Sequence, residues 1–139
     1  MTMLLALIVS LVTIGSSPPV KFSTLADGQA SAIEEERQVV VRTDAEWKAL
    51  WAKHAPGQKL PFVNFAKSTV IAVFLGTRNT GGYRAMITEI ERHGSDLVVT
   101  WQEEKPSPDL MVTQALTSPF HIVQIDKTTD PVRFAKATR

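Results

Sequence analysis

The sequence predicts an α+β domain with a small, mostly antiparallel sheet and one main amphipathic helix packed on a face. Three observations predict this class. A capped amphipathic helix starts at 43, and an apolar, β-branched run at 68–75 has the length of a buried strand. Two alternating segments, 83–91 and 97–103, flank a short polar turn, as the strands of a hairpin do. A chain of 139 residues has room for one such domain.

The chain begins with an apolar segment. Residues 3–14 contain only two polar positions, and the small residues Gly-Ser-Ser follow at 15–17. Twelve helical residues rise about 18 Å, short of the roughly 30 Å hydrocarbon core of a bilayer. This length favours a signal peptide, although no Lys or Arg precedes the apolar run. We expect residues 1–16 to be a signal peptide or an N-terminal anchor, with a buried core element as the alternative.

The next segments lead up to the helix. Residues 17–29 are predicted to be a linker, because Pro18-Pro19 favour extended backbone and small or polar residues follow. The folded domain is expected at 30–135. It opens with an extended element at 30–41 that ends in a run of three valines.

The helix carries the clearest local signals. Thr43-Asp44-Ala45-Glu46 has the spacing of a capping box, in which the Thr hydroxyl accepts a hydrogen bond from the Glu amide. One apolar face is formed at positions i, i+3, i+4 and i+7 by Trp47, Leu50, Trp51 and His54. Pro56-Gly57 ends the helix.

The second half of the chain is predicted to consist of strands and loops. The run at 68–75 predicts a strand buried on both faces. The remaining segments are a glycine-rich turn at 76–82, a hairpin at 83–91 and 97–103, an irregular connection with three prolines at 105–119, a strand at 120–127 and a short last strand at 132–134.

Composition and motifs exclude several classes of function. The net charge of +1 gives no attraction to nucleic acid, and a membrane contact is expected only through the N-terminal segment if it is not cleaved. The chain has no cysteine, which rules out disulfides and cysteine metal sites. Its histidines lack metal-ligand spacing, and its serines lack a Gly-x-Ser-x-Gly elbow. We therefore predict no catalytic residues, no metal and no cofactor.

Two loops are the candidate partner-binding regions. We call residues 76–83 the glycine loop and residues 105–119 the long loop. The glycines of the first allow close approach to a partner, and long loops are usually functional. The candidate residues are Arg78, Asn79, Gly81, Gly82, Tyr83, Leu110, Met111 and Gln114. The alternatives are that the glycine loop is a structural turn and that residues 110–112 tuck into the edge of the core.

An ordered series of residues resembles a known family. The series consists of Glu46-Trp47, Leu50-Trp51, Pro61-Phe62-Val63-Asn64-Phe65, Gly76, Gly81-Gly82-Tyr83, Gln114, Thr117-Ser118-Pro119 and Ile122-Val123. It resembles the C-terminal domain of PrcB, a protease complex subunit, over residues 30–135. One departure is Asn64, where the family commonly has an acidic residue. The resemblance implies a non-catalytic domain of the periplasm, cell envelope or secreted fraction that binds another protein, a secreted protease in the name-giving case.

Three functions follow as hypotheses. The first is a protein-binding accessory subunit of a secreted or envelope protease complex. The second is a protease inhibitor that presents the long loop to a protease cleft as a substrate-like strand. The third is a small-molecule or glycan binder that uses Trp47, Trp51 or Trp101 as a platform, and a buried Trp101 would remove it.

Overall fold

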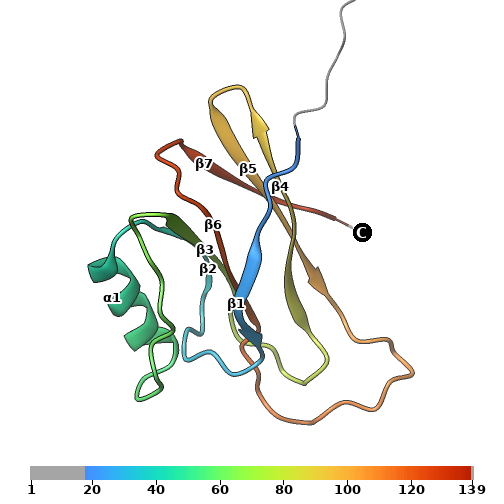
Figure 1. Cartoon of the computed structure of the whole chain (residues 1–139). Helices are drawn as coiled ribbons and strands as arrows, with labels where there is room; N and C mark the ends of the chain where they lie inside the picture. Colours follow the sequence, from blue (N-terminus) through green and yellow to red (C-terminus); the bar gives the residue numbers. More distant parts are fainter. Residues whose placement is uncertain (1–17, 139) are drawn as a thin grey trace, which may run out of the picture.

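The computed structural model describes residues 18–138, so the expected signal peptide at 1–16 lies outside the described residues (Figure 1). The elements are, in order, β1 (Ser23–Gly28), β2 (Glu36–Val41), α1 (Asp44–His54), β3 (Ser68–Leu75), β4 (Arg84–His93), β5 (Asp96–Glu104), β6 (Phe120–Asp126) and β7 (Val132–Lys136). The predicted α+β class is confirmed. No helix within 18–138 has the length and apolarity that crossing a membrane requires.

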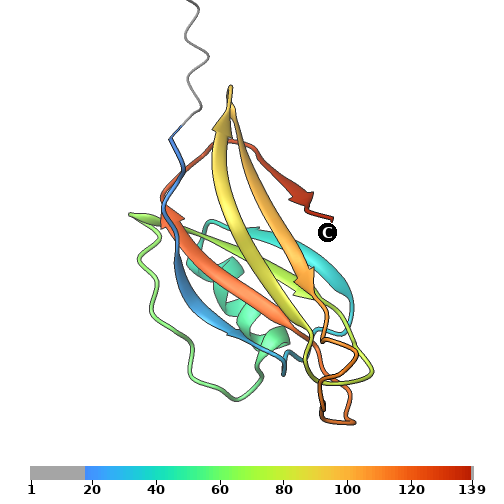
Figure 2. The same cartoon turned by 90° about the vertical axis from the view of Figure 1, so that its right-hand side faces the viewer.

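The strands form two sheets instead of the single small sheet that the sequence predicted. One sheet has the order β1-β6-β3-β2 and is antiparallel throughout. The other has the order β4-β5-β7, in which β4 and β5 are antiparallel and β5 and β7 are parallel. Figure 2 shows the β4–β5 hairpin in front of the four-stranded sheet and α1 behind it. The four-stranded sheet is therefore the middle of three layers.

This layering explains the continuous burial of β3, which confirms the prediction for 68–75. Successive side chains of a strand point to opposite faces of the sheet. Val70, Ala72 and Phe74 pack in the core that contains α1. Ile71, Val73 and Leu75 pack in the second core, against β4 and β5. An antiparallel strand is buried on both faces here because each face is covered by another layer.

The helix forms as its capping signal predicts. The Thr43 side chain accepts a hydrogen bond from the Glu46 N–H at 3.2 Å. The four residues of the apolar face are buried, as predicted: Trp47, Leu50, Trp51 and His54. The Trp47 indole N–H donates to the Pro61 carbonyl at 3.0 Å, and the Trp51 indole N–H donates to the Gln58 carbonyl at 3.1 Å. The segment that follows the helix is thereby fastened to it.

The linker prediction for 17–29 is wrong over Ser23–Gly28, which form β1 and pair with β6. Preceding residues also bind the other sheet, since the Val20 N–H donates to the Ile90 carbonyl at 2.7 Å. Val20 and Phe22 pack against one core, and Leu25 packs against the other. This segment therefore crosses from one sheet to the other. In the 30–41 element, only Glu36–Val41 is a strand.

Candidate functional site

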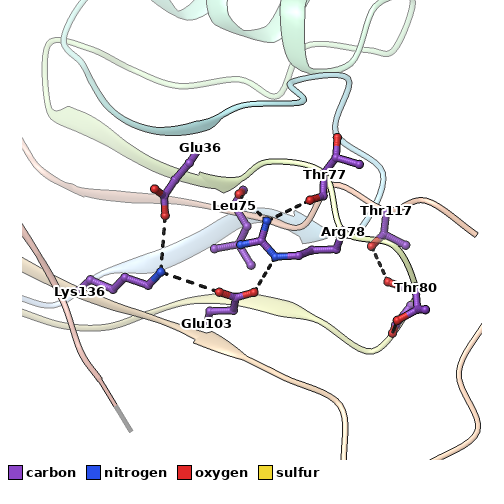
Figure 3. Close-up of polar contacts among 9 residues, drawn as sticks. Glu36, Leu75, Thr77, Arg78, Thr80, Glu103, Thr117 and Lys136 are labelled. Atoms are coloured by element: carbon purple, nitrogen blue, oxygen red, sulfur yellow. Dashed lines mark hydrogen bonds and ion pairs between the residues drawn. The ribbon is translucent and has the colours of Figure 1, made fainter.

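The structure brings the two candidate loops together. Arg78 and Thr117 exchange both backbone hydrogen bonds, with N···O distances of 2.7 and 2.9 Å. The Gly81 N–H donates to the Thr113 carbonyl at 2.9 Å. The Thr117 hydroxyl donates to the Thr80 carbonyl at 2.8 Å (Figure 3). The glycine loop and the long loop are thus one structural unit.

The close approach that the glycines allow is to the chain's own long loop. Gly82 has a φ of +91°, and a Cβ atom built there would lie 2.7 Å from the Pro106 Cβ and 3.0 Å from a Val112 methyl carbon. Both distances are shorter than ordinary van der Waals contact. Gly81 is buried and would place its Cβ 3.5 Å from Thr113. Gly81 and Gly82 therefore hold the two loops together rather than offering a free backbone to another molecule.

The Arg78 side chain donates its hydrogen bonds to other groups of the same domain (Figure 3). Its Nε donates to Glu103 Oε1 at 2.6 Å, and one terminal nitrogen donates to the carbonyls of Leu75 and Thr77 at 3.0 Å each. The guanidinium carbon also lies 6.0 Å from the centre of the Tyr83 ring. The bond to Arg78 lowers the pKa of the Glu103 carboxyl against the opposing effect of burial. The pair therefore stays ionised near neutral pH and fastens the glycine loop to β5.

The Glu103 carboxylate also connects the glycine loop to an edge strand of each sheet, β7 and β2, through Lys136. Lys136 Nζ of β7 lies 3.8 Å from Glu103 Oε2 and 3.6 Å from Glu36 Oε1 of β2 (Figure 3). It also lies 5.0 Å from the centre of the Trp101 ring, which is the geometry of a cation–π contact. Residues of β2, β5, β7 and the glycine loop are joined in one charged network.

The three tryptophans do not form a surface platform. Trp47, Trp51 and Trp101 are all buried, and Trp101 is only 3% exposed. In the part of the chain that the structure describes, the Trp101 indole N–H is the one buried side-chain polar group without a hydrogen-bond partner. The platform hypothesis is therefore wrong, because these side chains belong to the cores between the layers.

Apolar side chains of the long loop project into solvent. The exposed fractions are 98% for Met111, 73% for Leu116 and 58% for Leu110. Burial at the core edge, the alternative reading of 110–112, fails for Leu110 and Met111 and holds in part for Val112, which is half-buried against Gly82. Of the other candidates, Asn79 and Gln114 are exposed and Tyr83 is half-buried. Leu116 is absent from the predicted set, although an apolar residue in a polar loop was a usable signal.

The sequence pattern does not predict one further buried contact, which joins Ser31 and His54. Ser31 Oγ lies 2.8 Å from His54 Nδ1 in the buried interior. Ser31 Oγ also accepts the Ile33 N–H at 3.1 Å, and the His54 ring packs against the Phe120 ring at 4.2 Å between centroids. Burial lowers the pKa of His54. Across 18–138, no carboxylate bonds to His54, and no group of three potential metal ligands converges. The contact ties the segment before β2 to the end of α1.

Fold and site together define a small α+β domain whose main surface feature is a pair of joined loops. Residues 69–126 match the family model described as PrcB C-terminal, which confirms the resemblance. The match runs from β3 to β6 and contains both loops, but it is shorter than the 30–135 expected and leaves α1 outside. Comparison with curated proteins found no match, and neither did comparison with solved structures.

Loss of the Arg78 side chain is expected to destabilise the domain. Arg78→Ala removes the strongest partner of the Glu103 carboxylate, whose side chain is 11% exposed, and we expect a loss of about 2 kcal/mol in the free energy of unfolding. Arg84→Ala is the control, because its ion pairs are 3.8 and 3.9 Å long and the side chain is 55% exposed. Urea unfolding of both variants provides the measurement, and equal losses would contradict the assignment.

The pH dependence of the same pair has a defined sign. The pKa of Glu103 is lowered in the folded state from its ordinary value of 4.5. Its contribution to stability is therefore complete above about pH 4.5 and is lost as the pH falls through the folded-state pKa. Arg78→Ala should flatten the stability profile in this acidic range, and an unchanged profile would contradict the prediction.

Proposed function

We propose that the chain is an exported, non-catalytic protein-binding domain that serves as an accessory subunit of a secreted or envelope protease complex. The observation that carries the proposal is the exposed apolar set Leu110, Met111 and Leu116 on a loop that is fastened at its base. Exposed apolar side chains on a fixed scaffold are typical of protein interaction sites. The resemblance to PrcB, a protease complex subunit, supports the class of partner.

The proposed location is supported by the sequence alone. Residues 3–14 have the length of the apolar region of a signal peptide, and small residues follow them. The absence of cysteine does not oppose this location, because disulfides are common in exported domains but are not required by them.

Removal of the exposed apolar side chains is the test. We expect the double variant Met111→Ser, Leu116→Ser to fold normally, because neither side chain is buried. We expect its affinity for the native partner to fall at least about 30-fold, since even one interface anchor contributes roughly 2 kcal/mol. Capture from the exported fraction, identification of a protease by mass spectrometry and titration with that purified protease provide the measurement.

Phe62→Ser is the matched control. Phe62 is 90% exposed and lies between α1 and β3, outside both loops. It should retain the partner with wild-type affinity. Recovery of no protease above background, or recovery unchanged by the double variant, would contradict the proposal.

The inhibitor hypothesis is favoured by one specific feature. Leu110 and Met111 are exposed on a loop that is held by the Thr113 and Thr117 backbone bonds. An inhibitor loop needs the same combination, because a pre-ordered segment loses little entropy on entering a cleft. The peptidase rate of the captured protease separates the two functions. A rate that falls on addition of the domain indicates inhibition, and a rate that is maintained or raised indicates an accessory subunit.

A further inference from the structure

His121 lies where the two sheets meet. Its Nδ1 accepts a hydrogen bond from the Ile87 N–H of β4 at 2.9 Å, and its Nε2 lies 2.9 Å from the Thr24 hydroxyl of β1. Because Nδ1 is an acceptor, the neutral ring carries its proton on Nε2 and donates it to Thr24. The residue itself belongs to β6 and is 8% exposed. One buried side chain therefore bonds to two further strands, in different sheets.

Both bonds fall at irregularities in the sheets. The register of β4 with β5 shifts between Ile87 and Glu89. The register of β1 with β6 shifts between Thr24 and Ala26. A bulge interrupts the backbone pairing of its strand and leaves a residue without its regular partner. In β4, Ile87 stands next to the irregularity, and its N–H donates to the His121 ring and not to a backbone carbonyl.

The bonds also lie at the base of the joined loops. β4 begins at Arg84, directly after the glycine loop, and β6 begins at Phe120, directly after the long loop. Ile87 and His121 are close to these two starting points. A change in their contact therefore acts on the segments that hold the loops in place.

We propose that His121 is a proton-sensitive clasp between the two sheets, and that its protonation loosens the base of the joined loops and weakens their hold on the protein partner. This inference rests on the proposed function of the loops. A protonated imidazole has an N–H on both nitrogens and no acceptor, so it cannot receive the Ile87 N–H. Two donors then face each other in a buried site, which favours separation of β4 from β6.

The surroundings of the ring set the direction of the pH effect. Burial is the largest influence and lowers the pKa of His121 from its ordinary value of 6.5. Asp27 of β1 raises this pKa and Arg84 of β4 lowers it, and these two side chains lie 3.9 Å apart. The residue opposite on β3 is Val73, which does not titrate. The open state binds the proton more tightly, so the clasp is closed above about pH 6.5 and weakens as the pH falls below that value.

Amide hydrogen exchange on the free, full-length protein tests the clasp. The Ile87 amide should lose protection as the pH falls below 6.5, relative to the amides of β3 and after correction for intrinsic exchange. The loss is at most about tenfold per pH unit and ends where the ring of the folded protein is itself protonated. In His121→Asn, the Oδ1 atom stands near the position of Nδ1 and accepts without titrating. Ile87 protection in this variant should not depend on pH. A ratio of Ile87 protection to β3 protection that stays constant down to about pH 5 would overturn the proposal. The same pH-dependent loss of Ile87 protection in His121→Asn would also overturn it.

Two further measurements test the clasp, one on the wild-type protein alone and one on its affinity for the partner. If His121→Asn does not fold, the wild-type protein decides the question, because the loss of Ile87 protection must begin near pH 6.5 and level off where the His121 ring resonances titrate. Once the partner is purified, its affinity should fall on acidification for the wild type and stay constant for the Asn variant. Failure of the exchange test refutes the clasp and leaves partner capture unaffected, whereas failure of partner capture refutes the proposed function and leaves the exchange result intact.

Discussion

Gly76→Ala is expected to lower the free energy of unfolding by roughly 2–5 kcal/mol. Gly76 has a φ of +79° at the end of β3, where an L-residue is strained by about 1–2 kcal/mol. Its added Cβ would also lie 2.9 Å from the Glu36 N and 3.0 Å from the Glu34 O. These are backbone atoms, so they cannot move aside by a change of rotamer. The start of β2 must therefore shift, and this shift disturbs the ion pair between Glu36 and Lys136.

The chain offers a matched control for this prediction. Gly57 has nearly the same φ, +80°, and a Cβ there would meet nothing within 4 Å. Gly57→Ala should therefore show only the conformational strain of about 1–2 kcal/mol. Urea unfolding of the two variants compares strain alone with strain plus a backbone clash. A smaller or equal loss for Gly76→Ala would contradict the close contact between β3 and the start of β2.

Gly82→Ala is expected to separate the two loops while leaving both sheets intact. The new Cβ would occupy the space of Pro106 and Val112, which belong to the long loop. We expect the Gly81 amide, which donates to Thr113, to lose its protection from exchange. We expect partner affinity to fall at least about tenfold, because the apolar residues of the long loop lose their fixed base.

Gly94→Ala controls for strain in this second prediction. Gly94 has a φ of +65° in the turn between β4 and β5, and its added Cβ would meet nothing within 4 Å. It should keep both the Gly81 protection and the partner. A Gly82→Ala protein with wild-type protection at Gly81 would show that the loops do not depend on this contact.

Much of the fold could be predicted because its signals are local. The capping sequence at Thr43, the spacing of Trp47 and Leu50, and the apolar run of β3 each lie within about a dozen residues. The β4–β5 hairpin joins strands that are adjacent in sequence. Such patterns depend on the period of the secondary structure and need no knowledge of distant parts of the chain.

Apart from the exposed Leu116, the features that the sequence did not predict depend on partners that are distant in sequence. β1 contains Leu25 but shows no clear alternation, and it becomes a strand because β6 pairs with it. The sequence predicts Arg78 as a partner-binding residue, yet its donors bond to Glu103 and to backbone carbonyls. The two loops were selected separately for their composition, and nothing in either loop indicates that Thr117 would bond to Arg78.

The order of the strands has a consequence for when this domain can fold. The central strand β3 is flanked by β2 and β6, and β1 pairs only with β6, with Ser23 opposite Gln124. Long-range pairings of this kind form slowly, because the intervening chain must be closed into a loop first. A growing chain that has not reached Phe120 has no partner for β1 and exposes one edge of β3. Completion of the four-stranded sheet is therefore delayed until most of the chain has been synthesised.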